Sequence, residues 1–131
     1  MKKVLFVCVE NAGRSQMAEA FANSYGKGKV FAQSAGVRLA DKINPLAVMA
    51  MAEKGIDIST NKPKMLTMQM VKAADLIITM GCGAVDLCPG PFFKESIDWQ
   101  LEDPKDKSIE KVREIRDEIE RKIKQLVAQQ S

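Results

Sequence analysis

The residues with the clearest chemical potential are three cysteines, Cys8, Cys82 and Cys88, in a chain that contains no histidine. Without imidazole, neither a Ser-His or Cys-His catalytic pair nor a histidine-ligated metal site can form. Cys8 lies near the end of an apolar run, and Arg14 follows it at the spacing C-x5-R. A thiol close to an arginine suggests that a thiolate attacks an anionic substrate.

The segment that follows Cys8 has the features of an oxyanion-binding loop leading into a helix. Backbone N–H groups and the dipole at a helix N-terminus attract an anion, and the Arg14 guanidinium can bind two of its oxygens. The same positive field should favour the thiolate form of Cys8. Gly13 permits a close backbone approach, and Asn11 tolerates a left-handed conformation. The predicted loop consists of Glu10, Asn11, Ala12, Gly13, Arg14 and Ser15, with Ser15 donating to the Cys8 sulfur.

The alternative to this loop is a buried strand cysteine with an unrelated surface arginine. The C-x5-R spacing alone does not separate the two, and it is the strand-loop-helix context that favours the loop. The glycine-rich motifs G-x-G-x-x-G and G-x-x-x-x-G-K-[ST] are absent from the sequence, which disfavours a nucleotide-binding protein.

Asp103 is the candidate proton donor. A thiolate that attacks an oxyanion needs an acid for the departing oxygen, and in a chain without histidine a carboxylic acid is the candidate. Asp103 lies in a loop after the last predicted strand, and Pro104 disfavours helical geometry at that position. An ordinary Asp-Pro turn without a catalytic role is the alternative.

Cys82 and Cys88 lie in a Gly- and Pro-rich segment, predicted to be a loop over 81–93, after another predicted strand. A zinc site is not expected, because three cysteines without histidine leave one ligand short. A structural disulfide would be unusual in a reducing compartment. Two inert buried thiols are one interpretation, and a redox relay with the nucleophilic thiol through disulfide exchange is the other, which we favour.

These residues can meet only if strands and helices bring their loops to one edge. Apolar, β-branched stretches predict strands over 3–9, 29–32, 75–80 and 96–99. Helical spacing and capping residues predict helices over 16–24, 46–54, 64–73 and 109–126, with Asn44 and Pro45 opening the second and Gly55 closing it. This alternation predicts a flavodoxin-like three-layer α/β sandwich, whose four-stranded parallel sheet has helices on both faces. Such folds bind ligands beyond the carboxyl ends of their strands.

Composition and charge narrow the class of protein further. A length of 131 residues predicts a single domain over 1–131, and 46% hydrophobic and 28% charged residues exclude disordered, collagen-like and coiled-coil chains. The net charge of +3 is too small to indicate nucleic-acid binding. The apolar runs are too short for a membrane span, and the apolar run after Lys3 stops at Glu10, too early for a signal peptide. We expect a cytoplasmic protein that binds neither nucleic acid nor membranes.

Together the motifs resemble those of the thioredoxin-coupled arsenate reductases, which are built on the low-molecular-weight protein tyrosine phosphatase fold. The resemblance covers essentially the whole chain and rests on the segments 8–15, 34–36, 44–47, 55–59, 79–82, 88–89 and 98–104. The loop and the Asp-Pro pair are shared with the phosphatases of this family, whereas the Cys82/Cys88 pair is specific to the reductases.

The resemblance implies a mechanism without a cofactor. Cys8 attacks arsenate held by the loop amides and Arg14, while Asp103 protonates the leaving oxygen. Cys82 then attacks Cys8, arsenite leaves, and Cys88 converts the first disulfide into a Cys82–Cys88 disulfide that thioredoxin reduces. Phosphate and sulfate are implied as competing oxyanions.

Some positions depart from the phosphatases of the family. Lys105 and Asp106 follow the Asp-Pro pair where phosphatases usually have aromatic residues, so a phosphotyrosine ring has little to stack on. Glu10 places a negative charge in the loop, and Gly13 stands where phosphatases commonly have a second cysteine. A phosphatase acting on phosphate monoesters is therefore the second hypothesis, and an oxyanion-binding or redox-sensing module is the third.

Some of these reductases bind a potassium ion close to the loop. Asn11, Glu19 and Ser34 match that site, but Lys62 and Lys64 stand where other members have Thr and Asp. We expect a lysine ammonium to take the place of the ion and predict no bound metal.

Overall fold

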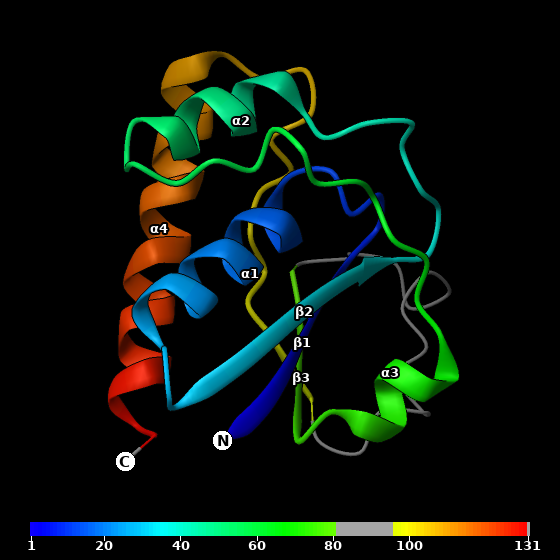
Figure 1. Ribbon diagram of the computed structural model, residues 1–131. Coiled ribbons are helices and arrows are strands. Elements are labelled where there is room, and N and C mark those ends of the chain that lie inside the picture. Colours follow the sequence, from blue (N-terminus) through cyan, green and yellow to red (C-terminus); the bar gives the residue numbers. More distant parts are fainter. Residues whose placement is uncertain (81–95, 131) are drawn as a thin grey trace.

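A computed structural model describes residues 1–80 and 96–130 (Figure 1). Strands and helices alternate along most of the chain. Their bounds are β1 (Lys2–Cys8), α1 (Arg14–Tyr25), β2 (Val30–Gly36), α2 (Pro45–Ala52), α3 (Met68–Ala73), β3 (Leu76–Thr79), β4 (Ser96–Asp98) and α4 (Ile109–Ala128). None of the helices among the described residues combines the length and the apolar character that a membrane span requires.

The four strands form one parallel sheet in the order β2-β1-β3-β4. Strand β1 is central, and Cys8 at its carboxyl end lies opposite Gly36 at the end of β2. Helices α1, α2 and α4 pack on one face of the sheet and α3 packs on the other (Figure 1). The predicted four-stranded parallel sheet with helices on both faces is confirmed.

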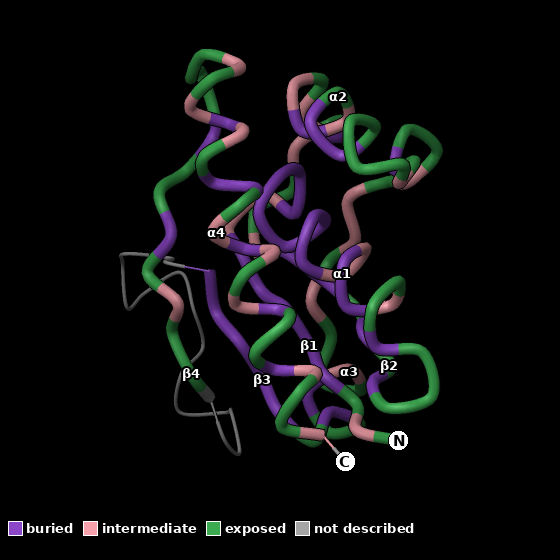
Figure 2. The backbone as a smooth tube through the Cα atoms, turned by 90° about the vertical axis from the view of Figure 1, so that its left-hand side faces the viewer, coloured by how far each residue is buried: buried purple, intermediate pink, exposed green. Residues whose placement is uncertain are grey.

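Alternating side chains of β1 contribute to two separate cores. Val4 and Phe6 belong to the larger core under α1, α2 and α4, whereas Leu5 and Val7 belong to the smaller core under α3. Each of these side chains is at most 2% exposed, and burying one such side chain contributes about 1.5–3 kcal/mol. Figure 2 shows β1 and β3 buried along most of their length, which makes them a rigid base for the loops that follow.

The predicted cap of α2 is confirmed: the Asn44 Oδ1 accepts from the Leu46 N–H at 2.9 Å and opens the helix. The Ser108 hydroxyl, which was not predicted as a cap, accepts from the Lys111 N–H and opens α4. Gly55 has a φ of +76° just after α2, a conformation that suits glycine.

Two predicted elements need correction. The helix predicted over 64–73 begins only at Met68, because the Thr67 hydroxyl caps it there and the chain before it pairs with β2. The Lys64 carbonyl accepts from the Gly36 N–H, and Met65 bridges to Gly36. Strand β2 extends to Gly36 instead of ending at residue 32, because its whole length pairs with β1.

Candidate active site

The loop between β1 and α1 closes around the Cys8 thiol. The Ser15 Oγ lies 2.7 Å from the Cys8 sulfur, and the Asn11 N–H donates to the same sulfur at 3.3 Å. Cys8 is only 2% exposed. Because it lies where α1 begins, the sulfur is close to the positive end of the helix dipole, which attracts a bound anion.

The buried Asn11 side chain holds this loop in place through hydrogen bonds. Asn11 is fully buried and has a φ of +54°, the left-handed conformation that the sequence suggested for it. Its side-chain amide donates to the Ser15 Oγ at 2.7 Å, and its Oδ1 accepts from the Gln16 Nε2 at 3.0 Å and from the Lys64 N–H at 2.8 Å. The loop is therefore tied to a segment more than fifty residues away, which local patterns do not reveal.

Two glycines allow the loop to pack against its neighbours. A Cβ on Gly13 would lie 2.8 Å from the Pro104 Cγ, and a Cβ on Gly36 would lie 2.8 Å from the Val9 carbonyl oxygen. Either contact is too short for a real side chain. The sequence suggested a close approach at Gly13, but the need for glycine at position 36 becomes visible only once β2 is placed beside the loop.

The Arg14 guanidinium lies deep in the site and points toward the Asp-Pro loop. Arg14 is 5% exposed, and its Nη1 donates to the carbonyl oxygens of Met80 and Leu101. Its Nη2 lies 3.7 Å from the carboxylate of Asp103, which is about half exposed. The Lys105 N–H donates to the Asp103 Oδ1 at 3.0 Å, forming a local turn that orients the carboxylate.

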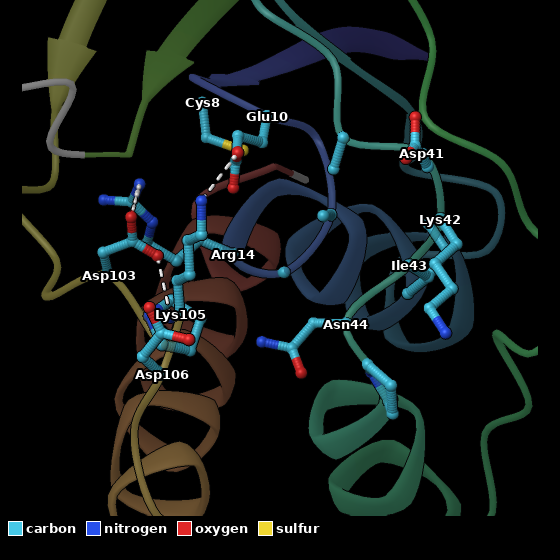
Figure 3. A pocket seen from close by; sticks show the side chains of 15 residues that line it. Cys8, Glu10, Arg14, Asp41, Lys42, Ile43, Asn44, Asp103, Lys105 and Asp106 are labelled. Carbon is cyan, nitrogen blue, oxygen red and sulfur yellow. Dashed lines mark hydrogen bonds and ion pairs between the residues drawn. The ribbon is translucent and has the colours of Figure 1, made fainter.

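Cys8, Arg14 and Asp103 all line one cavity of about 450 Å³. Its walls are the oxyanion loop, the segment 40–45 and the segment 103–106 (Figure 3). Among the described residues, no aromatic side chain lines the cavity, as the charged Lys105 and Asp106 suggested. The part of this wall at 40–43, with Asp41 and Lys42 in it, was missed from sequence, because no motif of that segment marks it as part of a site.

Lys64 lies beside Asn11 and Glu19, two of the residues for which the resemblance suggested a potassium site. Its ammonium is 2.8 Å from the Glu19 Oε1, which also accepts from the Ser34 hydroxyl at 3.0 Å. The Lys62 carbonyl accepts from the Gln16 Nε2. Lys64 therefore supplies the ammonium beside Glu19, whereas Lys62 contributes a backbone atom.

Cys82, Cys88 and the predicted loop over 81–93 lie outside the described residues. Strand β3 ends at Thr79, and the Met80 carbonyl oxygen accepts from Arg14. Cys82 follows Met80 by two positions in the sequence. The last described residue before the cysteine pair is therefore in contact with the oxyanion site.

Comparisons with known proteins identify the family and the fold. Residues 3–131 match the family described as low molecular weight phosphotyrosine protein phosphatase. A glutaredoxin arsenate reductase of Synechocystis sp. is 40% identical over 130 residues, which cover 98% of each chain. A solved structure of an arsenate reductase in its phosphate-binding state has a TM-score of 0.85 and 36% identity, with both chains fully covered.

A thioredoxin-dependent arsenate reductase of Corynebacterium glutamicum is also similar, with a TM-score of 0.77 and 42% identity. The match covers 96% of this chain and 60% of that one. The match over almost the whole length and the shared fold show that the chain belongs to the low molecular weight phosphotyrosine protein phosphatase family, as its motifs predicted.

Proposed function

We propose that this protein reduces arsenate to arsenite, with Cys8 as nucleophile and with Cys82 and Cys88 as the thiols that carry the oxidation away. The observation that carries this proposal is the cavity that Cys8, Arg14 and Asp103 line together, in a chain with two further cysteines that phosphatase chemistry does not require. The relatives named arsenate reductases support it.

The first step uses the residues that line the cavity. Arsenate binds to the loop N–H groups and the Arg14 guanidinium, where the N-terminus of α1 adds positive charge. The Cys8 thiolate attacks arsenic and forms a sulfur–arsenic bond. One arsenic–oxygen bond breaks, and the oxygen leaves as water with a proton from Asp103. The position of Asp103 at the outer side of the site suits this role.

The second step moves two electrons to arsenic. The Cys82 thiolate attacks the Cys8 sulfur, a disulfide forms, and the sulfur–arsenic bond breaks with its electron pair remaining on arsenic, which leaves as arsenite. Cys88 then attacks Cys82 and releases the Cys8 thiolate. A dithiol donor reduces the resulting Cys82–Cys88 disulfide.

Thioredoxin is the proposed donor, and the thioredoxin-dependent relative supports it. The Synechocystis relative is named for glutaredoxin, so both donors belong in the assay. Because the relay needs a reducing compartment, we propose the cytoplasm as its location.

The test is arsenite formation with thioredoxin, thioredoxin reductase and NADPH. We expect wild-type protein to consume NADPH when arsenate is added, and Cys82→Ser to abolish this turnover while sparing any hydrolysis of phosphate esters. Arsenite formation by Cys82→Ser at the wild-type rate would disprove the relay. Turnover with glutaredoxin and glutathione, but not with thioredoxin, would assign a different donor.

Hydrolysis of phosphate monoesters is the second candidate function, because Cys8, Arg14 and Asp103 suffice for it and the family includes phosphatases. The charged cavity without aromatic lining among the described residues argues against phosphotyrosine as the substrate. Turnover of esters without reduction of arsenate would favour this candidate. Binding of arsenate or phosphate without any turnover would favour a binding or sensing module.

A further inference from the structure

An ion pair joins two loops at the mouth of the active-site cavity. The Lys105 ammonium lies 3.3 Å from the Glu10 Oε2, and both residues line the cavity. Glu10 belongs to the oxyanion loop, whereas Lys105 belongs to the loop of Asp103. Figure 3 shows the lysine side chain extending from the Asp103 loop to Glu10. The pair is therefore a partly exposed part of the wall of the cavity that Cys8 and Asp103 also line.

Stability does not explain this pair well. The side chains are 60% and 31% exposed, and exposed ion pairs contribute little to folding. The two loops already touch beside the pair, where Pro104 packs against Gly13. The orientation of Asp103 depends on the backbone N–H of Lys105 and not on its ammonium. A role in selecting which anions enter the cavity explains the ion pair better.

The position of Asp103 shows where an organic leaving group would have to extend. A general acid must lie within hydrogen-bond reach of the leaving oxygen. In arsenate that oxygen carries at most a proton, but in a phosphate ester it carries the organic group. An ester bound with its phosphorus at Cys8 must therefore place this group next to Asp103, on the side where Lys105 reaches across to Glu10.

Charge at the mouth supports the same conclusion. Glu10 alone would repel every dianion, and Lys105 alone would attract every anion irrespective of its size. As a pair the two charges offset each other and leave an obstacle that discriminates by size. We propose that the Glu10–Lys105 pair is a filter that favours small inorganic oxyanions over phosphate esters at Cys8. Naming arsenate as the admitted anion rests on the proposed function.

The test compares an ester with an inorganic anion on the same protein. Two constants are measured: kcat/KM for p-nitrophenyl phosphate, which reports on the ester, and the inhibition constant Ki of inorganic phosphate, which reports on the small anion. The readout is the ratio of kcat/KM to 1/Ki. In the double variant Glu10→Ala/Lys105→Ala, we expect this ratio to rise about fivefold, the scale of an exposed ion pair. A rise in this ratio that comes from a larger kcat/KM for the ester cannot come from misfolding.

Two matched variants complete the experiment. Lys105→Arg keeps the pair and should keep the wild-type ratio. Lys107→Ala removes an exposed lysine that pairs with Glu102 outside the cavity, and it should leave the ratio unchanged. An unchanged ratio in the double variant, or equal losses in both constants, would overturn the filter. Neither constant depends on arsenate or thioredoxin, so a failure of the proposed reductase function would be seen separately.

Discussion

At the scale of single residues, the site depends on residues that lie outside the cavity. Neither Glu19 nor Lys64 lines the cavity, yet their ion pair lies directly behind the oxyanion loop. The backbone N–H of Lys64 donates a hydrogen bond to the Asn11 side chain, and the Asn11 N–H donates to the Cys8 sulfur. Lys64 is therefore a positioning residue, which acts on the nucleophile through Asn11.

Replacing Lys64 by Met should slow the reaction of Cys8 without removing any group that touches the substrate. Met keeps the backbone bond to Asn11 but leaves the Glu19 carboxylate, which is only 14% exposed, without the ammonium. We expect a loss of about 1 kcal/mol in unfolding free energy, as for a partly exposed ion pair. Alkylation of Cys8 by iodoacetamide should also become slower at a given pH, because the loop is held less firmly.

Lys62→Met is the matched control for this variant, because Lys62 contacts Gln16 through its backbone carbonyl. It should alkylate like the wild type, and Lys64→Arg should restore most of the lost rate. Equal alkylation profiles for Lys64→Met and wild type would contradict the positioning role.

At the scale of elements, charged side chains join α2 to α4 at the surface. Glu53, just after α2, accepts hydrogen bonds from Arg113 at 2.7 Å and from Arg116 at 2.6 Å, both in α4. These hydrogen bonds lower the pKa of Glu53 from 4.5 to about 2. Arg116 is buried and also donates to the Ala50 carbonyl, so this junction fixes the end of α2 against α4.

The stability contributed by Glu53 should depend on pH in a defined direction. Because its pKa is lower in the folded protein than in the unfolded chain, its contribution is fully present above about pH 4.5 and is lost as the pH falls toward 2. Glu53→Gln should therefore have a lower Tm than the wild type at pH 7. The difference should shrink as the pH falls through this window.

Thermal unfolding followed by circular dichroism from pH 7 to pH 2 would measure this effect. Glu114→Gln is the control, since Glu114 is 71% exposed and pairs with the half-exposed Lys111. It should change the Tm little at any pH. A Tm difference for Glu53→Gln that stays constant down to pH 2 would show that the carboxylate charge is not responsible.

Local patterns predicted the elements whose own residues determine them. The apolar stripe of the last helix requires burial on one side, and the β-branched run of β1 requires burial on both. The structure therefore contains α4 and β1 as the sequence predicts. The segment 64–67 has no such signal, because its extended form comes from pairing with Gly36. The residues of the oxyanion loop could be predicted, and the resemblance led us to expect a lysine ammonium at the Glu19 site, where Lys64 lies. The hydrogen bond from the Lys64 N–H to Asn11 and the close approach of Gly36 to Val9 join parts of the chain that are distant in sequence, and these could not be predicted.

At the scale of the whole molecule, the oxyanion site joins segments from across the chain. Arg14 at the start of α1 donates to Met80 after β3 and to Leu101 after β4, and Cys8 ends the central strand. The parallel sheet makes this possible, because the carboxyl ends of its strands meet at one edge. An anion bound there contacts a site that exists only while the whole sheet is folded.

Binding of an oxyanion should therefore stabilise the entire fold. A ligand present at a hundred times its Kd adds about 2.7 kcal/mol to the free energy of unfolding, which corresponds to a rise in Tm of roughly 5–10 °C for a domain of this size. We expect phosphate, arsenate and sulfate to raise the Tm of the wild type in a saturable manner. Cys8→Ser should respond in the same way, because the loop N–H groups and the Arg14 guanidinium remain. Arg14→Met should lose most of the response, and an equal rise in this variant would place the bound anion elsewhere on the molecule.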